Sequence, residues 1–184
     1  MYQKENQRIM ISKKMMKDGL LSLLTKKDLN KISVSELCKV SSINRSTFYR
    51  HYDTPEDVWE DIVRDYSKEL KTFLVKPNTI EDIQLSIDKL CEFIYQNSDV
   101  IRLSFRCHTS TDIANEIIEY IWQPFEEICD LKYLDEDTKH LTSTFVGYGM
   151  YHLFKQWIID EVPKTPHEVA KILYEIMDMK SVIK

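Results

Sequence analysis

Apolar residues recur at intervals of three and four along most of the chain, which is the spacing of a helix with one buried face. The first such stripe, from about residue 5 to 27, contains Ile9, Met16, Leu20, Leu23 and Leu24 with lysines between them. The same spacing predicts helices from Pro55 to about Leu74 and near 79–96, 98–107, 111–129, 137–160 and 166–179. These segments show helical rather than alternating periodicity, so the pattern predicts an all-α fold.

Capping signals place two short helices between residues 33 and 52. Ser33 precedes an apolar run and Glu36 follows it by three positions, as in a capping box. After a break, Asn44 can cap a second helix with the sequence RSTFYRHY, and residues 54–57 (TPED) begin the next one with a cap, a proline and two acids. Two short helices joined by a tight turn have the dimensions of a helix-turn-helix.

Composition excludes several classes of protein. Only three of the 184 residues are glycine, which argues against an all-β sandwich and leaves no glycine-rich loop for a nucleotide phosphate. No segment approaches the roughly 18 uncharged apolar residues of a membrane span, and the N-terminus lacks the apolar core of a signal peptide. We therefore expect no membrane association and a cytoplasmic location.

Four widely spaced cysteines lie in apolar periodic contexts and form no CxxC pair: Cys38, Cys91, Cys107 and Cys129. This pattern favours buried free thiols over disulfides or a zinc site, with a redox-sensing thiol as the alternative. No cofactor or metal is expected.

Charge divides the chain into two parts. Residues 1–52 carry 11 Lys and Arg against 4 Asp and Glu, a net +7, whereas residues 53–184 carry 14 against 26, a net −12. A basic head on an acidic body is typical of a protein whose head binds a polyanion. A lysine-rich solvated surface is the alternative.

The helix-turn-helix segment has a small apolar core and a polar outer surface. The core is predicted to contain Val34, Leu37, Cys38, Ile43 and Phe48. The outward residues are predicted to be Asn44, Arg45, Ser46, Thr47, Tyr49, Arg50 and His51. Arginine can contact guanine edges or phosphates, and hydroxyls can bind phosphates, so this surface suits DNA. An ordinary helical hairpin with a polar surface is the alternative.

Two stretches resemble a known family. The run KISVSELCKVSSINRSTFYRHYDTPEDVWEDIV is similar to the DNA-binding domain of TetR-family transcriptional regulators, in particular the branch with an NRSTFYRHF-like recognition helix. The run FVGYGMYHLFKQWIIDEVPKTPHEVAKIL resembles the last two, dimer-forming helices of that branch. The resemblance implies a DNA-binding domain over 1–53 and a helical regulatory and dimerisation domain over 54–184.

The resemblance also implies roles for individual residues. Ser33 and Ser35 would contact phosphates, and the recognition surface would be formed by Asn44, Arg45, Ser46, Thr47, Tyr49 and His51. One departure is that Pro55, Glu56 and Asp57 stand where many members place a phosphate-binding lysine. The helix N-terminus can still offer N–H groups to a phosphate, but the acids weaken the attraction. Affinity would then depend more on Arg45, Arg50 and the lysines of the first helix.

The second part of the chain is predicted to bind a second copy and a small molecule. Residues 141–159 are apolar almost all round and the last helix has its own apolar stripe, so a homodimer would cover both. The predicted dimer residues are Phe154, Trp157, Val169, Leu173 and Ile176. The predicted wall of an effector pocket contains Phe105, His108, Trp122 and Tyr148.

Together these features predict a ligand-responsive repressor that binds palindromic double-stranded DNA as a homodimer. A TetR-like coactivator or adaptor that acts through a protein partner is the alternative from another class. An all-α enzyme is disfavoured because Asp137 and His140 share a helical face without the Glu-x-x-His motifs of a di-metal bundle, and because no serine or cysteine lies in a nucleophile motif.

Overall fold

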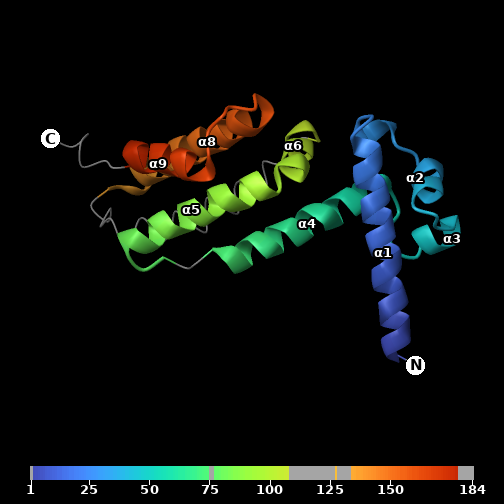
Figure 1. Ribbon diagram of the computed structural model, residues 1–184. Coiled ribbons are helices and arrows are strands. Elements are labelled where there is room, and N and C mark those ends of the chain that lie inside the picture. The colour runs from blue at the N-terminus through green and yellow to red at the C-terminus, as the bar shows by residue number, and fades with distance from the viewer. Residues whose placement is uncertain (1, 75–76, 108–126, 128–133, 178–184) are drawn as a thin grey trace. The chain divides into compact units, whose positions relative to one another are not determined.

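The computed structural model describes residues 2–74, 77–107, 127 and 134–177, and every regular element in these ranges is a helix (Figure 1). The predicted all-α fold is therefore confirmed. Contacts group the chain into two compact units, unit 1 from Met1 to Ser67 and unit 2 from Lys68 to Lys184. The helix predicted near 111–129 lies almost wholly outside the described residues.

Unit 1 contains α1 (Tyr2–Leu24), the 3₁₀ turn η1 (Leu29–Lys31), α2 (Val34–Val40), α3 (Arg45–Phe48) and most of α4 (Pro55–Phe73). Its core is formed by the apolar side chains on one face of α1 together with large side chains of the later helices. The most deeply buried of these residues are Met16, Leu20, Leu24, Leu37, Phe48, Val58 and Trp59. The helical spacing seen in the sequence thus corresponds to one continuous core.

A close approach of two helices explains the glycine in α1. A Cβ atom added at Gly19 would collide with the hydroxyl of Ser41, which is buried at the end of α2. Glycine at this position lets the α2 backbone pack directly on α1.

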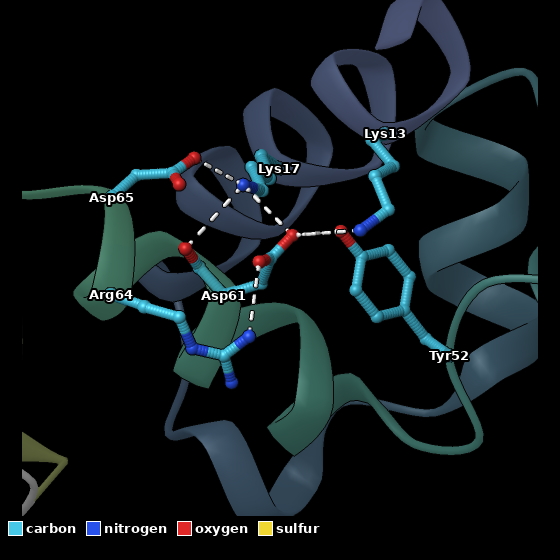
Figure 2. Close-up of polar contacts among 6 residues, drawn as sticks. All are labelled: Lys13, Lys17, Tyr52, Asp61, Arg64 and Asp65. Atoms are coloured by element: carbon cyan, nitrogen blue, oxygen red, sulfur yellow. Dashed lines mark hydrogen bonds and ion pairs between the residues drawn. The ribbon is translucent and has the colours of Figure 1, made fainter. Parts of the chain in front are cut away.

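A shared carboxylate links α1 to α4 (Figure 2). Oδ2 of Asp61 accepts a hydrogen bond from the Tyr52 hydroxyl at 2.6 Å and lies 2.9 Å from Nζ of Lys17 and 3.3 Å from Nζ of Lys13. Lys17 also pairs with Asp65 one turn further along α4. Burial alone would raise the pKa of Asp61, but the hydrogen bonds from Tyr52 and Lys17 and the lysine charges outweigh it and hold this pKa well below its usual range.

The start of α4 belongs to unit 1 because its inward side chains complete that core. Val58, Trp59 and Ile62 are buried, and Asp61 is bonded to α1. The compact unit therefore continues through Ser67, past residue 53, where the sequence places the end of the DNA-binding segment.

Unit 2 contains α5 (Ile80–Gln96), α6 (Ser98–Arg106), α8 (Glu136–Ile159) and α9 (Pro166–Met177). A capping box between Thr79 and Asp82 begins α5, and Asp135 caps α8 through the Thr138 N–H. α9 packs along α5, and α6 packs against α8 (Figure 1). Side chains from α5, α8 and α9 fill the core between them, among them Ile87, Leu90, Phe154, Trp157, Val169 and Leu173.

The described cysteines are free thiols, as predicted. Cys38 and Cys91 are buried and Cys107 is half-buried, whereas Cys129 lies outside the described residues. Burial raises the pKa of the Cys91 thiol to about 12, so this cysteine stays protonated at neutral pH.

We predict that Asp61→Asn lowers the free energy of unfolding at pH 7 by about 2 kcal/mol, because Lys17 and Tyr52 lose a charged acceptor. The lowered pKa of Asp61 means that its contribution is present above the ordinary carboxyl pKa of about 4 and is lost as the pH falls towards the lower, folded-state value. Urea unfolding should therefore show a difference between wild type and variant that begins to narrow below about pH 5 and continues to narrow below about pH 3.

Asp65→Asn is the matched control. This carboxylate also pairs with Lys17, but its side chain is 57% exposed, so its loss should cost less than about 1 kcal/mol. Equal losses in the two variants would contradict a special role for Asp61.

Candidate nucleic-acid interface

The turn between α2 and α3 has the hydrogen bonds of a helix-turn-helix connection. Ser33 caps α2 by accepting a hydrogen bond from the Glu36 N–H at 3.3 Å, as the sequence predicts. At the other end, Ser42 adopts a left-handed conformation with φ of 54°, and the Ile43 N–H bonds back to the Cys38 carbonyl at 2.9 Å. This closing motif usually uses glycine, so no glycine signal marked it in the sequence.

The recognition helix α3 is shorter than predicted. Asn44 occupies the N-cap position, and its carbonyl accepts hydrogen bonds from the N–H groups of Thr47 and Phe48. Its side chain makes no cap hydrogen bond, so the predicted side-chain cap is wrong. The helix ends at Phe48, and the chain then forms a turn in which the Phe48 carbonyl accepts the N–H groups of His51 at 2.9 Å and Tyr52 at 3.0 Å.

Phe48 anchors α3 in unit 1. Its side chain is completely buried and its ring lies 5.6 Å from that of Tyr49 and 6.1 Å from that of Tyr52. The Tyr52 hydroxyl donates a hydrogen bond to Asp61. The short segment that follows α3 is therefore fixed at one end by the buried Phe48 and at the other by Tyr52. The outer side of α3 is therefore presented on a fixed support.

Most of the predicted DNA-binding residues are on the surface of unit 1. Exposed are Ser33, Ser35, Asn44, Arg45, Ser46, Tyr49 and Arg50, whereas Thr47 and His51 are half-buried. Burial and the nearby charges of Lys13 and Arg50 lower the pKa of His51, so its ring is uncharged at neutral pH.

The acidic residues of unit 1 form ion pairs with some of its cations and leave others unpaired. Glu36, the acid of α2 and the nearest before Arg45 in the sequence, is bound by Lys27 at 2.6 Å. Lys13 and Lys17 are bound by Asp61. Within the described part of unit 1, the exposed cations that form no ion pair include Lys14, Lys26, Lys39, Arg45 and Arg50.

The start of α4 is a poor phosphate site. The Asp57 carboxylate accepts the N–H groups of Asp53 and Thr54, both at 2.8 Å, and the Asp57 N–H bonds to the Thr54 hydroxyl. These hydrogen bonds lower the pKa of Asp57 and keep it negatively charged. The expectation that this end offers its N–H groups to a phosphate is therefore wrong for these three.

The acids of α4 also reduce the charge of the unit that holds the recognition helix. Residues 1–67 carry 12 Lys and Arg against 10 Asp and Glu, so the net +7 of residues 1–52 becomes +2 for unit 1. Any attraction of unit 1 for a polyanion therefore depends on local unpaired cations rather than on net charge.

The predicted effector-pocket residues are only partly described. The half-buried Phe105 packs edge-on against Tyr151 at 5.4 Å, while Tyr148 is exposed. His108 and Trp122 lie outside the described residues.

The predicted dimer residues divide into two groups. Phe154, Trp157, Val169 and Leu173 are buried inside unit 2 of a single chain, so they are not available to a second copy without unfolding; Ile176 is 60% exposed. The exposed large apolar residues of α8 are instead Leu141, Phe145, Tyr148 and Ile159, and the first three are spaced by four and three positions along one helical face. All-round hydrophobicity of this helix made the two groups indistinguishable in the sequence.

None of the described helices has a stretch long and apolar enough to cross a membrane.

Comparison with known proteins agrees with the fold. Residues 81–179 match the sequence profile of the C-terminal region of TetR-type transcriptional regulators. No curated protein is significantly similar in sequence to the chain.

Solved structures share the fold at low sequence identity. The TetR transcriptional regulator of Streptococcus agalactiae 2603V is 19% identical, with a TM-score of 0.74 over 96% of this chain and 98% of that one. A TetR-family regulator of Bordetella parapertussis 12822 is 12% identical, with a TM-score of 0.66 over 90% and 94%. The dihydroxyacetone kinase operon activator DhaS is 13% identical, with a TM-score of 0.59 over 91% and 94%.

The profile covers more than half of the chain, and the fold of the whole chain agrees with it. The chain belongs to the TetR family of transcriptional regulators.

Proposed function

We propose that this protein is a repressor that binds a palindromic DNA operator as a homodimer and leaves it when a small molecule binds. The observation that carries the proposal is the outer side of α3. Arg45 at the start of α3 and Arg50, two residues after its end, are exposed and form no ion pair among the described residues, while Phe48 fixes the helix in the core of unit 1.

The two ends of the recognition segment have different proposed roles. Arg45 is the first residue of α3, and the N-terminal residues of a recognition helix are those that reach base edges. A guanidinium there can bind guanine O6 and N7 together. Tyr49 ends the helix with an exposed side chain, and we assign it a phosphate contact that positions the helix without reading sequence.

Two copies are needed for a palindromic site. We assign the dimer face to the exposed stripe of Leu141, Phe145 and Tyr148 on α8, together with Ile176 of α9. Association would remove these apolar side chains from water. A two-fold axis would then present two copies of α3 to successive major grooves about 34 to 36 Å apart.

Repression follows from occupancy of the operator, and release follows from a change in the separation of the two heads. An effector that binds more tightly to a dimer whose heads do not fit the groove spacing would shift the population to that form.

The second candidate is a coactivator or adaptor that acts through a protein partner. Two observations favour it: unit 1 has a net charge of only +2, and the α4 N-terminus carries acids where a phosphate contact would lie. DhaS, which has the same fold, is named as an operon activator.

Selection from random duplexes should enrich an inverted repeat. The logarithm of the affinity for that repeat should fall with the logarithm of salt concentration by about 0.9 for each phosphate neutralised. Weak binding that is uniform across sequences would favour the protein-partner alternative.

We predict that Arg45→Ala weakens binding to the selected site by about 1 to 3 kcal/mol and relaxes discrimination at one base position in each half-site. Tyr49→Phe should weaken all sequences nearly equally, because a phosphate contact carries no sequence information. Binding of both variants to every single-base change of the half-site distinguishes these outcomes. A uniform loss for Arg45→Ala would remove this arginine from the base-reading residues.

We predict that Phe145→Glu converts the dimer into monomers, because it places a charge at the centre of the proposed face. Phe145 is 76% exposed in the single chain, so the variant should keep its helical circular dichroism. Leu85→Glu is the matched control, an exposed apolar position on α5 that should leave the dimer intact. Sedimentation of the wild type as a monomer at micromolar concentration would disprove this assembly.

A further inference from the structure

Unit 2 contains a cavity of about 450 Å³ where the end of α5, the start of α6, the end of α8 and the connection to α9 meet. The residues that define its chemistry are Tyr95, Ser98, Arg102, Trp157, Glu161 and Lys164. None of them belongs to the effector pocket predicted from the sequence. The volume is within the range of small-molecule sites in proteins.

Arg102 has an unused hydrogen-bond donor in this cavity wall. Its Nη1 binds Oε1 of Glu161 at 2.7 Å. Its Nε is buried and has no hydrogen-bond partner within the described ranges. Buried N–H donors are nearly always satisfied, so this one indicates a missing acceptor. Nε and an Nη of one guanidinium form the fork that binds both oxygens of a carboxylate.

The present partner of Arg102 is easily displaced. The Glu161 side chain is 72% exposed, and an ion pair with so much water around it contributes little. Glu161 also has φ of 50°, directly after α8, where the Val162 N–H bonds to the Trp157 carbonyl. Glycine or asparagine adopts this left-handed backbone conformation more readily than glutamate. The carboxylate contact with Arg102 therefore distinguishes glutamate from those residues at this position.

Two aromatic rings form the apolar part of the wall. The rings of Tyr95 and Trp157 are stacked with 5.9 Å between centroids and 18° between planes. Trp157 is buried, and its Nε1 donates to the Lys164 carbonyl at 3.0 Å. Tyr95 is more than half exposed. The indole N–H is therefore satisfied within the chain, and ring surface of Tyr95 remains accessible to a planar ligand.

We propose that this cavity binds a small aromatic carboxylate, with its carboxylate on Arg102 and its ring against Tyr95. Lys164 is already paired with Glu168 at 3.9 Å, so the feature of the lining that favours an anion is the Nε–H of Arg102, which has no partner in the described part of the chain. Glu161 binds Nη1 of the same guanidinium and leaves the Nε side to the ligand, but its negative charge opposes a second carboxylate on Arg102. Binding of the carboxylate in this cavity does not depend on the proposed DNA-binding function. A role of this ligand as the effector does rest on that proposed function.

The test is calorimetric titration of the full chain, without DNA, with 1-naphthoate. Its neutral analogue 1-naphthamide and the ring-free anion acetate should each bind at least about tenfold more weakly, since each lacks one of the two contacts. Arg102→Gln should weaken 1-naphthoate by about tenfold. Glu161→Gln should strengthen it severalfold, because it removes the negative charge next to the carboxylate position.

Arg106→Gln is the matched control, since Arg106 is an exposed arginine one turn further along α6 and does not line the cavity. This variant should bind 1-naphthoate like the wild type. Equal affinity for the amide, or no saturable binding of 1-naphthoate, would overturn the proposal. If Arg102→Gln fails to fold, weaker rather than stronger binding by Glu161→Gln overturns it as well.

A separate measurement of operator binding with and without 1-naphthoate tests the effector role. Saturable binding without any change in DNA affinity would retain the site and reject that role. If the protein without ligand binds no operator at all, the proposed function is rejected and the cavity proposal is unaffected.

Discussion

A single carboxylate oxygen, Oδ2 of Asp61, organises unit 1. It receives Lys13 and Lys17 from α1 and the hydroxyl of Tyr52, the residue that ends the turn after α3 (Figure 2). One acceptor thus connects the first helix, the fourth helix and the recognition segment. A half-buried charge with three donors is costly to leave unsatisfied, so these elements keep one arrangement.

The ion pairs of unit 1 also determine which of its cations remain for DNA. Because acids already neutralise Lys13, Lys17 and Lys27, the head does not present a uniform basic surface. Arg45 and Arg50 lie unpaired on or next to α3, in the segment that Phe48 fixes. In the proposed function, recognition by a few well-placed cations would favour a specific site over general attraction to polyanions.

Features that depend on neighbouring residues in the chain were predictable from the sequence, and those that depend on distant ones were not. The helical spacing and the caps at Ser33 and Thr54 predicted the helices of unit 1. Each cap hydrogen bond joins residues only three positions apart, so it can be recognised in the sequence. The pairing of Glu36 with Lys27 rather than Arg45 depends on how two helices approach each other. Likewise, no periodicity could separate the buried Phe154 from the exposed Phe145 on one almost wholly apolar helix.

The most direct test of the central claim, that DNA is bound through α2 and α3, is amide hydrogen exchange of the full chain with and without its selected duplex. Slower exchange on DNA binding is expected for residues 33–52, with little change for residues 80–106 and 136–177. Protection confined to the second set, or none in either, would contradict the claim.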